Sequence, residues 1–414
     1  MRVLFKNIKQ LLQIREPGVS KVSGKDMGEL PVLDNAYLLT ENDRIADFGP
    51  MESLPAVDAD LEVDASGKML LPAWCDSHTH LVYAGNREKE FVDRIRGLSY
   101  EEIAARGGGI LNSARQLDSS SEDEIYEQSA KRLEEIMRLG TGAVEIKSGY
   151  GLTTESELKM LRVIKRLSES HPIEVKATFL GAHAFPKPFR DSPDKYVDLI
   201  CDVMIPKVAE AKLAEFIDVF CEKGYFSVEQ TQRIMERGKE YGLVPKIHVN
   251  QFNSIGGIQT AIQSEALTVD HLEVMTDKDF RDLEISQVMP VALPSCSYFL
   301  SIPYTPAREL IDRGMALAIA TDFNPGSTPS GNMNFAVSAA CIKMRLTPEE
   351  AINAATINGA YAMNLSQSHG SITRGKFANL ILTQEIPSYG FLPYAFGSNL
   401  LEKVMIGGEF LTEE

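Results

Sequence analysis

Short apolar runs recur through the middle of the chain and alternate with longer segments of mixed polarity. Each run has the length of a strand and is bounded by polar or glycine-containing turns. We therefore predict strands at residues 69–80, 142–148, 174–182, 217–221, 245–249, 267–271, 288–293 and 316–321.

Between these runs, apolar residues return at intervals of three and four, the spacing of one face of a helix. Thr347, Pro348 and Glu350 predict the start of a further helix through a capping box. Eight strand-then-helix units predict an α/β fold in which parallel strands close into a TIM-like (β/α)8 barrel. The clearest helical patterns cover 122–139, 155–167, 228–241 and 306–312.

The two ends of the chain do not follow this alternation. Both carry short strand patterns separated by turn signals, for example at 37–40 and 404–408. We expect residues 1–66 and 368–414 to build one small β domain of sandwich type beside a barrel at 67–367. Two separate β modules are the less economical alternative.

Composition and charge narrow the classes of partner. Of 414 residues, 44% are hydrophobic and 24% are charged, as in ordinary globular proteins, and the formal net charge is −16. Such an acidic chain lacks the basic surface that binding to nucleic acid or to an anionic membrane requires. An anionic small-molecule ligand therefore has to be met by a local cation.

Cysteine usage and segment hydropathy indicate the compartment. The five cysteines are scattered and without C-x-x-C spacing, which is typical of reduced thiols in a cytosolic protein. The N-terminal segment is interrupted by Lys6 and Lys9 and makes a poor secretory signal. No segment offers the roughly 18 uninterrupted apolar residues of a membrane-spanning helix, so we expect a cytoplasmic protein.

The first predicted barrel strand ends in a histidine pair within PAWCDSHTHL. Side chains alternate between the two faces of a strand, so Asp76, His78 and His80 share one face. Two imidazoles on one face suit a transition metal, with a carboxylate as ligand or as hydrogen-bond partner. The alternative is a half-buried strand with two solvated histidines.

Active sites of this fold class lie at the C-terminal ends of the barrel strands. For His171 and His369, which do not lie at strand ends, we expect solvated surface positions. Five of the seven histidines do lie at predicted strand ends, namely His78, His80, His183, His248 and His271. The same edge carries Lys147, Tyr150, Glu222 and Asp322.

Four of these residues form a candidate metal site: His78, His80, His248 and Asp322. Imidazole nitrogen and carboxylate oxygen are good ligands for zinc and for iron. We predict one Zn²⁺ or Fe²⁺/Fe³⁺ ion per subunit, with a water ligand whose pKa falls toward about 7. Hydrogen-bonded core histidines without a metal are the alternative.

Longer motifs around these residues resemble the amidohydrolase superfamily. They extend from about Gly67 to Gly375 and read HTHLVYAGNR, GGGI, VEIKSGYGL, ELKMLRV, TFLGAHAFP, DVFCEKGYFS, DHLE and ATDFNPGS. Within the superfamily they are most similar to the hydrolases that open the imidazolone ring in histidine degradation. The resemblance implies hydrolysis of 4-imidazolone-5-propanoate to N-formimidoyl-L-glutamate, a single metal ion and a homodimer.

The resemblance also implies substrate-binding residues, each with an ordinary structural alternative. Arg87 supplies a fork-shaped cation for a carboxylate, or is a surface residue of a long loop. Tyr150, between two glycines, presents its hydroxyl to the ligand, or packs within a plain turn. Asn324, Gly326 and Ser327 resemble a ligand-binding loop, although their composition is that of any turn-rich loop.

For catalysis we predict His271 as the base or the group that orients water, and His183 as a donor to the developing oxyanion. Asp322 would carry a proton to the departing ring nitrogen. His183 and Gln251 are also expected to contact the substrate. Gln251 stands three residues after His248, where some relatives carry Glu, and an amide cannot act as an acid.

Three other functions are weighed against this one. Deaminases of the superfamily rely on an acid at H-x-x-E, which this chain lacks. Dinuclear relatives bridge two metals with a carboxylated lysine, for which Lys147 is the candidate. Noncatalytic barrel proteins lack parts of the metal set, whereas all four ligands are present here.

Two details complete the comparison with the superfamily. Ser327 stands where the family usually has Thr, and because the hydroxyl is retained we expect little consequence. The long segment 84–120 contains Gly107, Gly108 and Gly109, which suit a lid hinge or a tight loop that needs positive φ.

Overall fold

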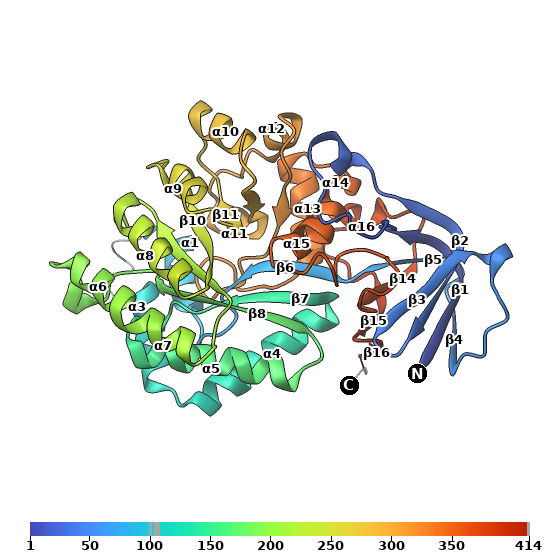
Figure 1. The fold of residues 1–414 in the computed structure, drawn as a ribbon, viewed down its shortest axis with the longest axis horizontal. Coiled ribbons are helices and arrows are strands. Elements are labelled where there is room, and N and C mark those ends of the chain that lie inside the picture. The colour runs from blue at the N-terminus through green and yellow to red at the C-terminus, as the bar shows by residue number, and fades with distance from the viewer. Residues whose placement is uncertain (99–101, 103–107, 412–414) are drawn as a thin grey trace.

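The computed structural model describes residues 1–98, 102 and 108–411, which form two sheets with helices packed around one of them. Figure 1 shows the barrel and its helices on one side and a sheet built from both chain ends on the other. The predicted hinge at Gly107 lies outside the described residues. Gly109, the N-cap of a helix, has a φ of 81°, which favours glycine.

The barrel sheet contains eight parallel strands in sequence order. The first and last strands close it through two backbone hydrogen bonds: Asp322 N donates to His78 O over 3.0 Å, and His80 N donates to Phe323 O over 2.8 Å. Closure of the barrel therefore brings the predicted ligands His78 and His80 next to a third, Asp322. The strands are β6 (Trp74–Thr79), β7 (Thr141–Lys147), β8 (Glu174–Ala182), β9 (Phe216–Cys221), β10 (Val244–Val249), β11 (Thr268–His271), β12 (Met289–Ala292) and β13 (Ala318–Ile319).

Amphipathic helices follow the barrel strands and pack their apolar faces on the sheet, so that the strands are buried on both sides. The predicted helical segments are confirmed to within a few residues. The helices are α1 (Glu88–Ile95), α3 (Ile110–Ser119), α4 (Glu122–Arg138), α5 (Thr154–Ser170), α6 (Pro193–Leu199), α7 (Ile205–Glu210), α8 (Val228–Glu240), α9 (Gly257–Gln263), α10 (Asp277–Glu284), α11 (Pro294–Leu300), α12 (Ala307–Asp312), α13 (Met333–Met344), α14 (Pro348–Ala355), α15 (Ile357–Tyr361) and α16 (Phe391–Tyr394).

Helix α14 begins as the sequence predicts. The Thr347 hydroxyl accepts from Glu350 N, and the Glu350 carboxylate accepts from Thr347 N over 2.8 Å, which completes a capping box. Among the described residues, no helix is both long and apolar enough to cross a membrane.

The second sheet joins strands from both chain ends, as predicted, and its eight strands pair as one mixed sheet. A separate apolar cluster fills one of its faces, so this sheet has a core of its own. The predicted boundaries at residues 66 and 368 stay a prediction. The strands are β1 (Arg2–Leu12), β2 (Val32–Glu41), β3 (Arg44–Pro50), β4 (Leu61–Asp64), β5 (Lys68–Pro72), β14 (Leu380–Glu385), β15 (Leu401–Ile406) and β16 (Glu409–Phe410).

The prediction of one strand over 69–80 is wrong, because the run contains two strands in different sheets. Strand β5 pairs with β1 and β14 in the terminal sheet, whereas β6 opens the barrel. The backbone changes partner at Ala73, whose N–H donates to Asn379 O, while the next N–H, of Trp74, donates to Gly140 O. Hydropathy alone does not reveal this change because both strands are buried.

The prediction of solvated positions for the two remaining histidines is also wrong. His369 is only 5% exposed, and its Nδ1 lies 2.8 Å from the Ser368 hydroxyl. Burial, reinforced by the nearby Lys376 ammonium, lowers the pKa of His369 to about 4. The His171 side chain is 11% exposed and closes the C-terminal end of α5, where its Nδ1 lies 3.1 Å from Leu167 O.

Candidate metal centre and active site

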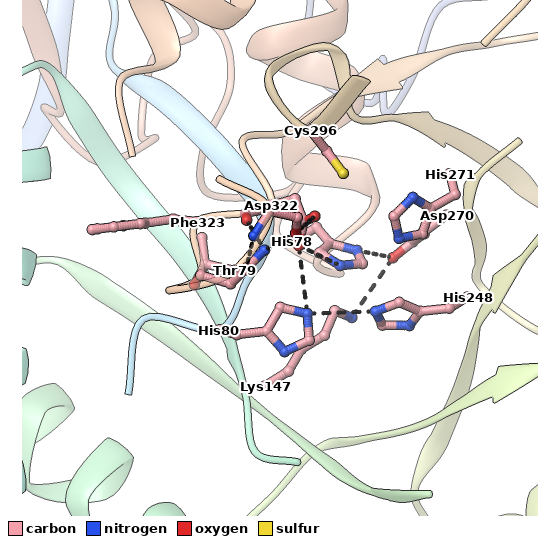
Figure 2. A network of polar contacts seen from close by, with 12 residues as sticks. His78, Thr79, His80, Lys147, His248, Asp270, His271, Cys296, Asp322 and Phe323 are labelled. Atoms are coloured by element: carbon pink, nitrogen blue, oxygen red, sulfur yellow. Dashed lines mark hydrogen bonds and ion pairs between the residues drawn. The ribbon is translucent and has the colours of Figure 1, made fainter. Parts of the chain in front are cut away.

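The four predicted metal ligands meet at one end of the barrel, where all of them are buried (Figure 2). The Asp322 Oδ1 atom lies 3.6 Å from His78 Nε2 and 3.6 Å from His80 Nε2. The His80 and His248 Nε2 atoms are 3.5 Å apart. Donor atoms of three different strand ends therefore converge on one point.

These residues fit a metal ion. His78, His80 and Asp322 can each place a ligand atom within 4.8 Å of the others, and so can His78, His248 and His271. His78 Nε2 is buried and has no hydrogen-bond partner among the described residues, a costly arrangement unless a cation binds there. His271, predicted as a base, therefore also lies within reach of the ion.

A carboxylate stands behind two of the metal-facing histidines. Asp270 Oδ2 lies 2.6 Å from His78 Nδ1, and Asp218 Oδ2 lies 2.9 Å from His248 Nδ1. Such carboxylates fix the ring orientation and leave Nε2 free to bind a metal. Neither aspartate was predicted from the sequence, although polar residues inside buried strands such as DVFC and TVDH were a signal for them.

Below these carboxylates lies a fully buried network of charged side chains inside the barrel. The Lys147 ammonium contacts Glu145 Oε1 at 2.5 Å, Asp218 Oδ2 at 2.8 Å and Asp270 Oδ2 at 3.6 Å. The Lys246 ammonium pairs with the other oxygen of Glu145 and also donates to Ser77 O over 3.2 Å. The network links two lysines to the carboxylates that orient the histidines.

The charges around Lys147 argue against the alternative in which a carboxylated Lys147 bridges two metal ions. Burial alone would lower the pKa of Lys147, but Asp218 and Glu145 outweigh it and raise the pKa above its usual value. Carboxylation requires a neutral amine, so the surroundings of Lys147 favour an ammonium that serves as an internal counter-ion.

His183 and Tyr150 lie next to the metal-facing histidines. The His183 ring stacks on His80 at 5.1 Å between centroids, and its Nδ1 lies 3.0 Å from Gly149 O. Burial lowers the pKa of His183 to about 3, so the ring is neutral and the carbonyl holds its proton on Nδ1. His183 Nε2 is then a hydrogen-bond acceptor, whereas the sequence led us to expect a donor to the developing oxyanion. The Tyr150 ring centroid is 5.4 Å from that of His183.

His271 is paired with a carboxylate that the sequence analysis did not single out. Glu273 Oε1 lies 3.2 Å from His271 Nδ1 and also accepts from the Ser297 hydroxyl. Burial lowers the pKa of His271, but Glu273 outweighs this effect, and the pKa is raised above its usual value. The pair suits a base that must take up a proton.

The loop after β10 brings Gln251 to the site. Glu222, at the end of β9, accepts from the backbone N–H groups of Phe252 and Asn253, over 2.9 and 3.1 Å. Glu222 therefore shapes this loop. The Gln251 amide lies 3.7 Å from Cys296 Sγ and carries no charge.

The loop after β13 connects Asp322, a predicted metal ligand, to the predicted substrate-binding residues. Asn324 Oδ1 accepts from both Gly326 N and Ser327 N over 2.8 Å, and Asn324 Nδ2 donates to the Ser327 hydroxyl over 2.7 Å. That hydroxyl also lies 3.3 Å from Asp322 Oδ2. Hydrogen bonds thus connect the predicted loop residues to Asp322.

Backbone strain marks the same strand ends. Asn250, His271 and Asp322 have φ angles of 57°, 89° and 56°, in the left-handed region that residues other than glycine rarely adopt. Each follows or ends a barrel strand and turns the chain at the site. Strain of this kind persists at functional sites because the surrounding structure holds it.

A cavity of about 580 Å³ opens above the histidines. Of the predicted site residues, only His78 does not line it, because it lies beneath the others. The cavity brings together His80, Arg87, Tyr150, His183, His248, Gln251, His271, Asp322, Asn324, Gly326 and Ser327.

The model of the amidohydrolase family matches residues 69–411 of this chain. The chain therefore belongs to the amidohydrolase family.

Curated relatives give a finer placement. An imidazolonepropionase from Flavobacterium johnsoniae is 66% identical over 411 residues, which cover 99% of this chain and 100% of the relative. One from Christiangramia forsetii is 65% identical over the same shares of both chains. Within its family, the chain thus groups with the imidazolonepropionases.

Solved structures share the fold at much lower identity. Escherichia coli guanine deaminase superimposes with a TM-score of 0.75 at 13% identity, over 100% of this chain and 99% of that one. An adenosine deaminase from Xanthomonas campestris, solved with bound zinc, gives a TM-score of 0.71 at 16% identity, over 99% and 92% of the two chains. At such identities these structures establish the fold alone.

Proposed function

We propose that this chain hydrolyses the ring of 4-imidazolone-5-propanoate to N-formimidoyl-L-glutamate, as an imidazolonepropionase. The single observation that supports this most strongly is the identity of 66% to an imidazolonepropionase along the whole chain. The site is compatible with the reaction, because a histidine-rich ligand set faces a cavity that is also lined by arginine. Water adds to the ring carbonyl carbon, and the bond from this carbon to the adjacent ring nitrogen breaks.

His78, His80, His248 and Asp322 would hold one divalent ion, and both zinc and iron suit this donor set. When bound, the ion would polarise the ring carbonyl and lower the pKa of a water ligand toward about 7.

His271 would take the proton from the attacking water. Its Nδ1 faces Glu273 at 3.2 Å, so its Nε2 is the atom left for the proton, and the carboxylate stabilises the imidazolium that forms. Asp322, which lines the same cavity, would take the second proton of the attacking water and deliver it to the departing ring nitrogen. That nitrogen leaves as part of the formimidoyl group.

Three side chains would hold the ring. His183 Nε2 would accept a hydrogen bond from a ring N–H, since its own proton is held on Nδ1 by Gly149 O. Tyr150 would donate its hydroxyl, and burial raises its pKa, which keeps the phenol protonated. Gln251 would hydrogen-bond the ring without transferring a proton.

Arg87 and the loop of Asn324, Gly326 and Ser327 would bind the propanoate side chain and the newly formed carboxylate. Arg87 is the N-cap residue of α1 and lines the cavity with that loop. A Cβ atom at Gly326 would overlap the Arg87 guanidinium, so glycine permits their close approach.

The runner-up is deamination of a related heterocycle, since deaminases share this fold. A deaminase of this type needs a carboxylic acid to protonate the leaving amine, and the corresponding residue here is Gln251.

We further expect a homodimer in the cytoplasm.

The first test is turnover of freshly generated 4-imidazolone-5-propanoate by the purified protein, followed by loss of its ultraviolet absorbance and identification of the product. Turnover to N-formimidoyl-L-glutamate that stops on chelation is the expected result. Substrate left intact by a folded, metal-loaded sample would contradict the proposal, and deamination would then be assayed with aminated heterocycles.

The assignment of His271 has a separate test. Replacing it with Ala should lower kcat by about 10²–10⁴-fold, because a positioned base contributes about that much. A variant that retains its metal and near-normal turnover would show that another group takes the proton.

A further inference from the structure

Helix α1 (Glu88–Ile95), which follows Arg87, presents one polar face to the cavity. Arg87, Glu90 and Arg94 are separated by three and four residues, the spacing of one helix face, and all three line the cavity. Sequence analysis singled out only Arg87. Charged residues at i, i+3 and i+7 were the signal for the other two.

Arg87 is already paired within the protein. Its Nε and Nη2 atoms both contact Glu90 Oε2, at 2.8 and 2.6 Å, and the other oxygen of Glu90 accepts from Asn112 Nδ2 over 3.3 Å. The Glu90 side chain is only 9% exposed, so this pair is largely removed from water. Glu90 therefore fixes the position of Arg87 and neutralises much of its charge.

Arg94 is held differently. Its Nη2 atom donates to Gly326 O over 3.3 Å, and its guanidinium lies 5.6 Å from the Phe299 ring centroid. Its Nη1 atom is buried and has no hydrogen-bond partner among the described residues. A buried donor without a partner is costly, which indicates a place for an acceptor.

The positive charge of these three side chains is not fully compensated, which favours binding of an anion. The Glu90 carboxylate contacts the Arg87 guanidinium at 2.6 Å, so among these three side chains the charge of Arg94 is left without a contacting carboxylate. Burial lowers the pKa of Arg94, and repulsion from Arg87 lowers it further. A ligand carboxylate would relieve both the repulsion and the unpartnered donor.

We propose that Arg94 is a second anchor for the propanoate carboxylate of the substrate, beside Arg87, and that its Nη1 atom makes the contact. The inference rests on the proposed function, because that function supplies the carboxylate. Both guanidinium groups meet at Gly326, which lies four residues after the ligand Asp322. Arg94 therefore sets which side chain the heterocycle may carry.

The test compares the natural substrate with the methyl ester of its propanoate side chain, using the metal-loaded protein and the variants Arg94→Met, Arg94→Lys and Arg96→Met. Arg96 is the matched control, because it is exposed and does not line the cavity. For the acid, Arg94→Met should lower kcat/KM about 10–100-fold, mainly through KM, since a charge-assisted hydrogen bond is lost. For the ester, it should change kcat/KM by less than about threefold.

Arg94→Lys should recover part of the acid's kcat/KM, and Arg96→Met should behave as the wild type. Equal losses for acid and ester in Arg94→Met would show that Arg94 only supports the Gly326 loop, and would overturn the inference. Unchanged turnover of the acid would overturn it as well. Wild-type turnover of the acid tests the proposed function separately, and turnover of the ester shows that a variant is folded.

Discussion

The two ends of the cavity, the metal end at the histidines and the arginine end at Arg87 and Arg94, differ in how their charged side chains are paired. At the metal end, charged side chains from four barrel strands are buried and contact one another, as with Lys147, Glu145 and Asp218. At the other end, α1 carries Arg94, whose Nη1 atom has no hydrogen-bond partner in the part of the chain that the structure describes. The buried charges of the metal end are paired with one another, whereas the arginine end would be completed by the proposed ligand carboxylate.

The difference follows from the cost of burying charge. Removing one member of a buried ion pair leaves an uncompensated charge, so the residues of the metal end depend on one another. At the arginine end, Glu90 pairs with Arg87, whereas the half-buried Arg94 keeps a donor that a ligand can satisfy. Chemistry is therefore fixed in the barrel, while selection of the substrate's side chain is left to α1 and the loop after β13.

The largest effect is expected from His78→Ala, which removes a ligand from the metal end. Loss of the ion removes several kcal/mol of transition-state stabilisation, so turnover should fall by more than about 10³-fold. Metal content measured by elemental analysis should fall with it. A variant that loses turnover but keeps a full metal complement would place His78 outside the ligand set.

The next largest effect is expected from Lys147→Met, which leaves Asp218, Glu145 and Asp270 without their shared cation. The free energy of unfolding should fall by about 3–5 kcal/mol, as when one partner of a buried ion pair is removed. Chemical denaturation measures the change. The exposed Lys165→Met is the control and should stay within about 0.5 kcal/mol of the wild type. Equal stabilities would refute the counter-ion role of Lys147.

A smaller effect is expected from Asp270→Asn, which retains the shape of the side chain behind His78 but removes its charge. Metal affinity should fall by about 10–100-fold, as is usual when a carboxylate behind a ligating histidine is changed. Competition with a chelator of known affinity measures it. The exposed Asp123→Asn is the control, and matching affinities for both variants would show that the His78–Asp270 contact does not tune the metal.

The smallest effects are expected in the loop that joins the two ends. Ser327→Ala removes a hydroxyl that contacts Asn324 at 2.7 Å and Asp322 at 3.3 Å, and should cost about 0.5–1.5 kcal/mol in kcat/KM. Ser327→Thr retains the hydroxyl and should stay near the wild type. Equal losses in the two variants would indicate that the hydroxyl is not what matters there.

The barrel and the convergence of its histidines with Asp322 were predictable from the sequence because both depend on local pattern. Strand-length apolar runs mark the strands, and parallel strands bring the residues at their ends together, so His248 and Asp322 were found together with His78. The change of sheet at Ala73 was not predictable, because β5 and β6 are equally buried and only their partners differ. The burial of His369 likewise depends on distant packing.

The charged residues inside the barrel were missed for another reason. Glu145 and Lys147 stand two residues apart on β7 and so share a face, which was visible in the sequence. Their partners, Asp218 and Lys246, come from other strands, and pairing across a barrel is a property of the closed fold. Arg94 was within reach of sequence reasoning, since its spacing from Arg87 places it on the same helix face.

The position of β5 has a consequence for how the protein is made. β5 pairs with β1 from one end of the chain and with β14 from the other, and it continues through Ala73 into the strand that carries His78. Such pairing requires closure of a very long loop, which slows folding. During synthesis, β5 lacks one of its two neighbours until β14 (Leu380–Glu385) has been made. The terminal sheet is therefore completed only after the last predicted metal ligand, Asp322, has been synthesised.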